Sequence, residues 1–317
     1  MKILVTDPLS QAGISILKAA GHDVDERLKL SPADVTALVS AYDVLLVRSG
    51  TKATAEMIAH MDKMKIIGRA GAGVDNIDVP AATKKGIVVM NTPGGNTQST
   101  AEHTLAMIFA MARSIPFAHA SLVAGAWDRK KYMGMELRGK TLGVIGFGRI
   151  GAEVARGAMA LGLRVMAYDT LITPEEIASQ GYVPATLDDI YANADIITVH
   201  VPLLSSTRHM ITDEQLGKCK RGVCIVNCAR GGIVDEEALV RALESGQVSR
   251  AALDVFTVEP PPPDHPLLHH PRVVVTPHIG SATTEAQENV AVQIAEQVVA
   301  ALSGGALVGT VNNVPLR

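Results

Sequence analysis

This 317-residue chain has few aromatic residues and few cysteines, and it lacks both long apolar runs and an excess of positive charge. Aromatic residues make up 3% of it and the net charge is −3, whereas nucleic-acid-binding proteins usually have a basic excess. No apolar run approaches the roughly 20 residues that cross a bilayer as a helix, and the opening MKILVTDPLS lacks the pattern of a signal peptide. We therefore expect neither a nucleic-acid partner nor a membrane partner.

The cysteines are few and irregularly spaced. Cys219, Cys224 and Cys228 fit neither a C-x-x-C redox pair nor a zinc-binding pattern. An odd, sparse set favours reduced thiols buried as small side chains, and hence a cytoplasmic location. We predict no metal site.

Short apolar segments rich in Val and Ile alternate with helical patterns along the chain. Strands are expected near residues 3–5, 44–47, 66–68 and 87–89 in a first set, and near residues 142–145, 165–168, 196–199, 223–226, 251–255 and 273–275 in a second. Continuous apolar strands between helices indicate a parallel sheet that is covered on both faces. The two sets predict an α/β protein with two doubly wound parallel-sheet domains.

The connection between the two predicted domains is not a simple linker. Residues 96–113 are predicted to form one helix, with Ser99 and Glu102 at the spacing of a capping box. The last helix, residues 285–302, follows the second set of strands but is expected to return to the first domain. We therefore predict a discontinuous first domain, 1–95 and 284–317, with the second domain, 96–283, inserted into it and a cleft between the two.

A glycine-rich segment, GFGRIG, follows the predicted strand 142–145. Gly146 suits a tight turn, Gly148 suits close approach of a pyrophosphate, and Gly151 suits packing of the next helix on the strand. Asp169 ends the next strand, about 20 residues further on, where an acid binds the ribose of NAD and repels the 2′-phosphate of NADP. The segment predicts a Rossmann domain that binds NAD.

Three ionisable residues follow strands of the second set. Arg230 stands in NCARGG directly after a buried strand, and an arginine there needs an anionic partner, for which we propose a ligand. Glu259 and His278 follow the next two strands. Because ligands bind at the carboxyl ends of parallel strands, the three side chains are expected to converge.

The motifs NCARGGIVDEEAL, ALDVFTVEPPP and VVVTPHIGSAT resemble signatures of the D-isomer-specific 2-hydroxyacid dehydrogenases. The segments VRSGTKATAEMI, IIGRAGAGVDNIDVPAATKKGIVVMNTPGGNTQSTAEHTLAMIFAMARSIP and GAWDRKKYMGMELRGKTLGVIGFGRIG are similar to the phosphoglycerate dehydrogenase branch of that family. The resemblance implies a Rossmann NAD-binding domain inserted into a flavodoxin-like substrate domain, in a homodimer.

The resemblance also implies residue roles. Arg230 binds the substrate carboxylate, His278 is the general acid/base, and Glu259 hydrogen-bonds the second nitrogen of His278. The implied cofactor contacts are Gly146, Gly148, Arg149, Ile150, Gly151, Asp169, Cys228, Ala229, Arg230, Asp254, His278 and Gly280. The implied substrate contacts are Arg48, Arg69, Gly71, Gly73, Arg129, Arg230 and His278.

The sequence departs from the family pattern at two places. Val201 and Ala72 stand where the family often has threonine, so no hydroxyl contact is expected at either position.

Positive charge at the first sheet bears on the choice of substrate. Arg48 and Arg69 each end a strand of the first set and therefore point to the same sheet edge. The resemblance implies that they bind a substrate phosphate, and that Arg129 reaches the neighbouring subunit's site. The alternative is that all three arginines are solvated charges on the protein surface.

The expected activity is reversible NAD-dependent oxidation of 3-phospho-D-glycerate to 3-phosphohydroxypyruvate, the first step of serine biosynthesis. One alternative is a reductase for hydroxypyruvate, glyoxylate or another anionic 2-oxo acid such as sulfopyruvate. Another is an NADH-sensing, corepressor-like binding protein. Because the chain ends at residue 317, we expect no serine-binding regulatory domain.

Overall fold

The computed structural model describes residues 1–316, and the chain divides into two compact units. Unit one combines Met1–Asn96 with Ser281–Arg317, and unit two is Thr97–Gly280. Arg317, which ends the predicted first domain, lies outside the described residues.

Unit one is built on a five-stranded parallel sheet with the strand order β2-β1-β3-β4-β5. Its strands are β1 (Lys2–Val5), β2 (Asp23–Glu26), β3 (Val44–Val47), β4 (Ile66–Arg69) and β5 (Val88–Asn91). This order is the flavodoxin-like one, which confirms the predicted class of the first sheet.

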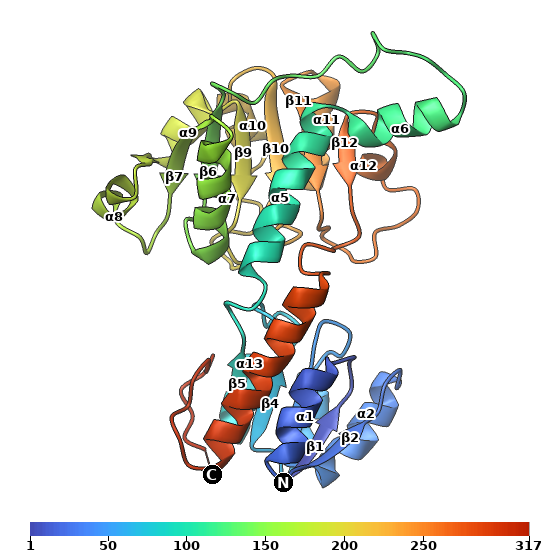
Figure 1. Cartoon of the computed structure of the whole chain (residues 1–317), viewed down its shortest axis with the longest axis vertical. Helices are drawn as coiled ribbons and strands as arrows, with labels where there is room; N and C mark the ends of the chain where they lie inside the picture. Colours follow the sequence, from blue (N-terminus) through green and yellow to red (C-terminus); the bar gives the residue numbers. More distant parts are fainter. Residues whose placement is uncertain (317) are drawn as a thin grey trace. The chain divides into compact units, whose positions relative to one another are not determined.

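Helices cover both faces of the first sheet (Figure 1). They are α1 (Gln11–Ala19), α2 (Pro32–Leu38), α3 (Ala55–Ala59), α4 (Val79–Lys85), α13 (Thr284–Leu302) and the 3₁₀ turn η1 (Val39–Ala41). Successive strand residues point to opposite faces, so Leu45 and Leu46 enter different apolar clusters. The helix from the end of the chain, α13, packs on α1, where a Cβ at Gly13 would lie 2.5 Å from the carbonyl oxygen of Ala291.

Unit two is built on a seven-stranded parallel sheet with the order β12-β11-β10-β9-β6-β7-β8. Its strands are β6 (Thr141–Ile145), β7 (Arg164–Tyr168), β8 (Val183–Pro184), β9 (Ile196–Val199), β10 (Val223–Asn227), β11 (Val248–Leu253) and β12 (Val273–Val275). From β8 to β11 this is the Rossmann order, and β12 extends it by one strand. The prediction of two doubly wound parallel sheets is confirmed.

The helices of unit two also lie on both faces of its sheet (Figure 1). They are α5 (Thr97–Ala112), α6 (Ile115–Val123), α7 (Arg149–Ala160), α8 (Pro174–Ser179), α9 (Leu187–Asn193), α10 (Asp213–Lys218), α11 (Glu236–Glu244) and α12 (Pro266–His269). Among residues 1–316, no single helix has the length and apolarity to cross a membrane. The pair α5 and α6 meets that test only jointly, across a 61° bend.

Two details differ from the sequence prediction. The edge strands β2 and β8 were not predicted, because β2 reads DVDE and β8 has only two residues. The capping box at Ser99 and Glu102 is wrong: α5 begins at Thr97, so Ser99 lies inside the helix. Glu102 instead accepts a hydrogen bond from the side-chain amide of Gln98 at 2.7 Å.

Candidate active site

The glycine-rich turn between β6 and α7 has the shape that a pyrophosphate requires. Gly146 has a φ of +94°, and a Cβ there would lie 2.7 Å from the carbonyl carbon of His200. A Cβ at Gly151 would lie 2.0 Å from the carbonyl oxygen of Gly146. A Cβ at Gly148 would meet nothing within 4 Å, so this part of the turn is open to an approaching anion. The turn is narrow where the helix packs and open where a ligand would bind.

The start of α7 gives the same turn an electrostatic preference. Gly148 is the N-cap, and Arg149 and Ile150 form the first turn, with no side chain capping it. The N–H groups at a helix start lack partners within the helix, and the helix dipole adds partial positive charge. Phosphate groups are therefore favoured at this point, and the predicted contacts at Arg149 and Ile150 stay consistent with that.

Asp169 follows β7 and links the glycine turn to the next loop. Its Oδ2 accepts a hydrogen bond from Phe147 N at 2.7 Å, and its Oδ1 accepts from Leu171 N at 2.7 Å and from Ile172 N at 3.3 Å. Oδ2 keeps a lone pair for a ribose hydroxyl, and the charge of the carboxylate disfavours a 2′-phosphate. These properties fit NAD.

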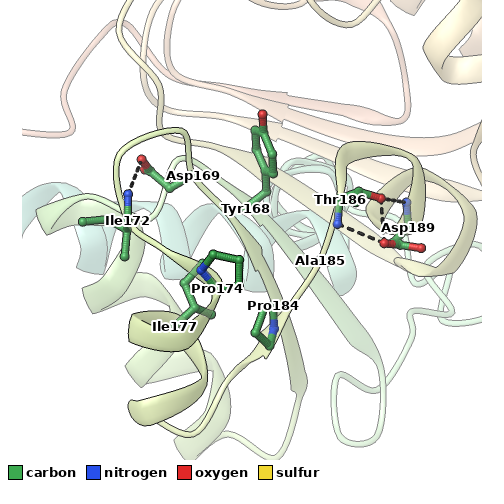
Figure 2. A pocket seen from close by; sticks show the side chains of 9 residues that line it. All are labelled: Tyr168, Asp169, Ile172, Pro174, Ile177, Pro184, Ala185, Thr186 and Asp189. Atoms are coloured by element: carbon green, nitrogen blue, oxygen red, sulfur yellow. Dashed lines mark hydrogen bonds between the residues drawn. The ribbon is translucent and has the colours of Figure 1, made fainter.

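A cavity of about 300 Å³ lies beside Asp169 (Figure 2). Its lining combines apolar side chains with two acids and is formed by Tyr168, Asp169, Ile172, Pro174, Ile177, Pro184, Ala185, Thr186 and Asp189. Thr186 and Asp189 are hydrogen-bonded to each other as the cap of α9, which leaves the apolar side chains as the main contact surface. The cavity gives unit two space for an apolar ring next to the predicted ribose site.

His278 and Glu259 form a direct pair. Nδ1 of His278 lies 2.7 Å from Oε2 of Glu259, and Oε1 of Glu259 accepts a hydrogen bond from Phe256 N at 3.0 Å. Burial acts to raise the pKa of Glu259, but the bonds from His278 and Phe256, with the charges of His278 and Arg230, hold it below its ordinary value. Glu259 is therefore a carboxylate at neutral pH. It accepts a hydrogen bond from the Nδ1–H of His278, which leaves Nε2 for a reacting group.

Arg230 lies on a turn that is fixed by its own neighbours. The side chain of Asn227 accepts a bond from Ala229 N at 3.0 Å and donates to the carbonyl oxygen of Arg230 at 2.8 Å. Nη1 of Arg230 donates to the carbonyl oxygen of Ala229 at 2.6 Å. A Cβ at Gly231 would lie 1.9 Å from the carbonyl oxygen of Phe256. The turn of Arg230 thus packs against the loop of Glu259, and the structure brings Arg230, Glu259 and His278 together.

Asp254 is buried behind this group, with 1% of its surface exposed. Its oxygens accept hydrogen bonds from Thr276 Oγ1 at 2.6 Å, Ile279 N at 2.9 Å and Gly280 N at 2.8 Å. Nε2 of His103 lies 3.2 Å from the same carboxylate. Sequence reasoning missed His103 and Thr276, because a histidine inside a helix and a threonine before proline carry no spacing signal. The predicted cofactor contacts of Asp254 and Gly280 stay predictions.

A cofactor contact was predicted at Cys228, but the thiol of this residue is not accessible. Cys228 is 5% exposed and belongs to an apolar cluster, and burial raises the pKa of its thiol to about 12. Cys228 and Ala229 can therefore contact the cofactor through their backbone groups only. Within residues 1–316, no group of three or more His, Cys, Asp or Glu residues could hold a metal ion.

In unit one, Arg48 and Arg69 lie at the carboxyl ends of the paired strands β3 and β4. Nε of Arg69 donates to the carbonyl oxygen of Arg48 at 3.4 Å, and its Nη1 donates to the carbonyl oxygen of Gly73. Arg48 is half-buried, its Nε has no hydrogen-bond partner, and burial lowers the pKa of its guanidinium. Two arginines therefore end neighbouring strands, and the side chain of Arg48 is incompletely satisfied.

The turn around Arg48 is held by a buried acid. Oδ2 of Asp7 accepts bonds from Arg48 N at 2.6 Å and Thr51 N at 3.0 Å. The side-chain amide of Asn76 donates to the carbonyl oxygens of Arg48 and Thr51 at 2.7 and 2.6 Å. These bonds fix the backbone from which the arginine projects.

The other predicted substrate residues differ in the groups that they leave available to a substrate. The N–H of Gly71 is already engaged: it donates to Thr92 Oγ1, after β5, at 2.8 Å and to the carbonyl oxygen of Arg69 at 2.9 Å. Gly73 supplies a carbonyl oxygen to Arg69. Arg129 is exposed on the segment after α6, in unit two. Direct substrate contacts at Gly71, Gly73 and Arg129 stay predictions.

Comparison with known proteins agrees with this geometry. Residues 105–280 match the model of the D-isomer specific 2-hydroxyacid dehydrogenase, NAD binding domain. D-3-phosphoglycerate dehydrogenase of Rattus norvegicus is 50% identical over 311 residues, which are 98% of this chain and 58% of the rat protein. The chain thus spans less than two thirds of the length of this relative.

Two solved structures are similar over nearly the whole of both chains. A glyoxylate reductase from Paecilomyes thermophila has a TM-score of 0.89 and 33% identity, covering 98% of each chain. An NAD⁺-bound 3-phosphoglycerate dehydrogenase from Entamoeba histolytica has a TM-score of 0.84 and 30% identity, covering 99% of each chain. Because the family model matches more than half of the chain and the glycine turn has the matching geometry, the chain belongs to the D-isomer-specific 2-hydroxyacid dehydrogenases and carries their NAD-binding domain.

Proposed function

We propose that the chain catalyses reversible NAD-dependent oxidation of 3-phospho-D-glycerate to 3-phosphohydroxypyruvate, and so serves serine biosynthesis. The discontinuous unit is then the substrate domain, and Thr97–Gly280 is the dinucleotide domain. The observation that carries the substrate assignment is the position of Arg48 and Arg69 at the carboxyl ends of the neighbouring strands β3 and β4. Two guanidinium groups suit a phosphate, which accepts their hydrogen bonds bidentately.

The residues of unit two account for the chemistry. NAD, when bound at the glycine turn and Asp169, supplies the hydride acceptor. Nε2 of His278 takes the proton of the substrate hydroxyl as the carbonyl forms, because Nδ1 is bonded to Glu259. The ionised Glu259 stabilises the resulting imidazolium, and in the reverse direction His278 returns the proton. Arg230 holds the substrate carboxylate next to this pair.

Reduction of an unphosphorylated 2-oxo acid is the second candidate, because the chain is 33% identical to a glyoxylate reductase over 98% of both chains. Steady-state rates with 3-phosphohydroxypyruvate, hydroxypyruvate and glyoxylate separate the two proposals. We expect Arg48→Ala and Arg69→Ala each to lower kcat/KM for the phosphorylated substrate about ten- to a hundredfold, since charge-assisted bonds contribute roughly 1.5–3 kcal/mol.

The same variants provide the control for that experiment. With hydroxypyruvate, which has no phosphate, the two arginine variants should keep most of the wild-type kcat/KM. An equal loss with both substrates would mean that the substitutions damage the domain. A wild type that prefers glyoxylate or hydroxypyruvate would remove the phosphoglycerate assignment.

We also propose a homodimer, with a second copy covering the face formed by α6 and the segment after it. Figure 1 shows this part extending from the sheet of unit two. Five apolar side chains in this part are more than half exposed, namely Ile115, Leu122, Val123, Trp127 and Met133. We expect Leu122→Glu to halve the mass measured by light scattering, and Val308→Glu, at an exposed apolar side chain of unit one, to leave it unchanged. A wild-type monomer would contradict the proposal.

The cysteines bear on the location. Cys219, Cys224 and Cys228 are buried and free, and burial raises the pKa of each thiol. Free thiols are typical of a reducing compartment, and we propose the cytoplasm.

A further inference from the structure

The loop that carries His278 is attached to the residue Asp254 at four points. The carboxylate of Asp254 binds Thr276 Oγ1 on one side of His278, and Ile279 N and Gly280 N on the other side. The carbonyl oxygen of Asp254 accepts a bond from His278 N at 2.8 Å. The direction of the His278 side chain therefore depends on where the Asp254 carboxylate is held.

The backbone at His278 needs this support. Its φ is +54°, in the left-handed region that residues other than glycine seldom occupy. Such a conformation persists when surrounding bonds determine it, and it is frequent at functional sites. Here the surrounding bonds are those to Asp254, together with the 2.7 Å bond from the His278 ring to Glu259.

His103 also holds the Asp254 carboxylate, from a separate helix. It lies on α5, and its Nε2 is 3.2 Å from Oδ1 of Asp254 and 3.1 Å from Oγ1 of Thr276. Because the Thr276 hydroxyl donates to Asp254, it can accept from His103, so one N–H is shared by both oxygens. The His103 side chain is 16% exposed, which limits competition from water.

The charge state of Asp254 agrees with this arrangement. Burial acts to raise the pKa of Asp254, but the hydrogen bonds from His103, Thr276 and the amides of Ile279 and Gly280 hold it below its ordinary value. A buried carboxylate that stays ionised requires all of its donors, and the loss of one leaves charge unsatisfied.

We propose that His103 is a positioning residue for the reaction, acting on His278 through Asp254. It fixes the carboxylate to which both flanks of the His278 loop are bonded, and so keeps Nε2 of His278 directed at the substrate hydroxyl. His103 itself touches neither the reacting atoms nor Glu259. The role in catalysis rests on the proposed dehydrogenase activity, whereas the role in holding the loop does not.

The test compares His103→Leu, which removes the donor, with His103→Gln, whose amide nitrogen can replace Nε2. His60→Leu is the matched control, because His60 is exposed in unit one and its ring is hydrogen-bonded to the backbone oxygen of Glu56 in the same turn. The first readout is amide hydrogen exchange at Ile279 and Gly280, followed by NMR. We expect exchange about tenfold faster or more in His103→Leu, near wild type in His103→Gln, and unchanged in His60→Leu.

The second readout is kinetic. We expect His103→Leu to lower kcat about tenfold or more, since small misplacements of a catalytic group have effects of that size. The dissociation constant of NADH, from fluorescence titration, should stay within about twofold of wild type, since the glycine turn is untouched. His103→Gln should recover most of kcat.

Two results would overturn the inference. One is wild-type exchange at Ile279 and Gly280 in His103→Leu. The other is faster exchange spread over all of unit two with a matching fall in Tm, which would mean a general packing defect. If the wild-type protein shows no dehydrogenase activity, the proposed function fails, while the exchange data still decide whether His103 holds the loop.

Discussion

At the scale of single residues, the environment of Glu259 determines what His278 can do. Glu259 is ionised because its hydrogen bonds and the charge of Arg230 outweigh the effect of burial on its pKa. It therefore accepts a hydrogen bond from the Nδ1–H of His278, with 2.7 Å between the two heavy atoms. This leaves one ring nitrogen to exchange a proton with substrate, which is the requirement for general acid/base catalysis.

The first prediction concerns this pair. We expect His278→Ala to lower kcat at least about a hundredfold, the usual contribution of acid/base catalysis, with little change in NADH affinity. Glu259→Gln should keep more activity but move the pH–rate profile of the reduction to lower pH, because an amide no longer favours the imidazolium. The measurement is steady-state kinetics across pH, with NADH binding measured separately.

The control for the pair is Glu237→Gln. Glu237 is exposed and pairs with Arg241 on its own helix, so its replacement should leave the profile unchanged. Near-full turnover in His278→Ala would exclude the assigned role of that residue.

Sequence reasoning at this scale worked where a residue follows a strand. Arg230, Glu259 and His278 could be grouped in advance because the carboxyl ends of parallel strands meet at one sheet edge. His103 and Thr276 could not, since they are separated by 173 positions and meet through tertiary packing alone. The hydrogen bond of the Gly71 N–H could not be predicted either, because its acceptor, the hydroxyl of Thr92, follows a different strand.

At the scale of elements, apolar strands were predictable and polar edge strands were not. β3 reads VLLV and is buried throughout, so its pattern alone indicates a central strand. β2 reads DVDE and is only partly buried, because it pairs with β1 at the edge of the sheet. An edge strand with one partner carries charged side chains and leaves no apolar run to detect.

The second prediction concerns the turn that joins two parts of the site. A Cβ at position 231 would lie 1.9 Å from the carbonyl oxygen of Phe256 and 2.5 Å from Thr257 N, which are backbone atoms on the loop of Glu259. Gly231→Ala should therefore destabilise the protein by at least about 2 kcal/mol, the range of overpacked positions, and displace Arg230 relative to Glu259. Urea unfolding and kcat/KM measure the two effects.

Gly217→Ala is the matched substitution for that experiment. Gly217 lies in α10, where a Cβ would meet nothing within 4 Å, so alanine should be neutral or stabilising by about 0.5–1 kcal/mol. If Gly231→Ala behaved like Gly217→Ala, the close approach of the two loops would be wrong.

At the scale of the whole molecule, protonation of partly buried histidines links the fold to pH. Burial lowers the pKa of His200 from its ordinary 6.5 to about 4, and its Nε2 lies 3.0 Å from Oγ1 of Thr198. His200 follows β9, and its backbone packs against Gly146 of the glycine turn. Burial also lowers the pKa of His22 and His270. Below pH 6.5 the unfolded chain therefore binds more protons than the folded chain does.

The third prediction follows from the sign of that difference. A histidine whose pKa is lower in the folded state contributes its full stability above pH 6.5, and this contribution is lost as the pH falls from 6.5 toward 4. For His200 the loss is on the order of 2–3 kcal/mol. We expect the urea midpoint of the wild type to fall over this interval, and His200→Gln to fall less, because glutamine has no proton to gain. His22 and His270 still contribute, so some slope should persist. The exposed control His60→Gln should keep the wild-type slope. If His200→Gln also kept the wild-type slope, protonation of His200 would not destabilise the folded state.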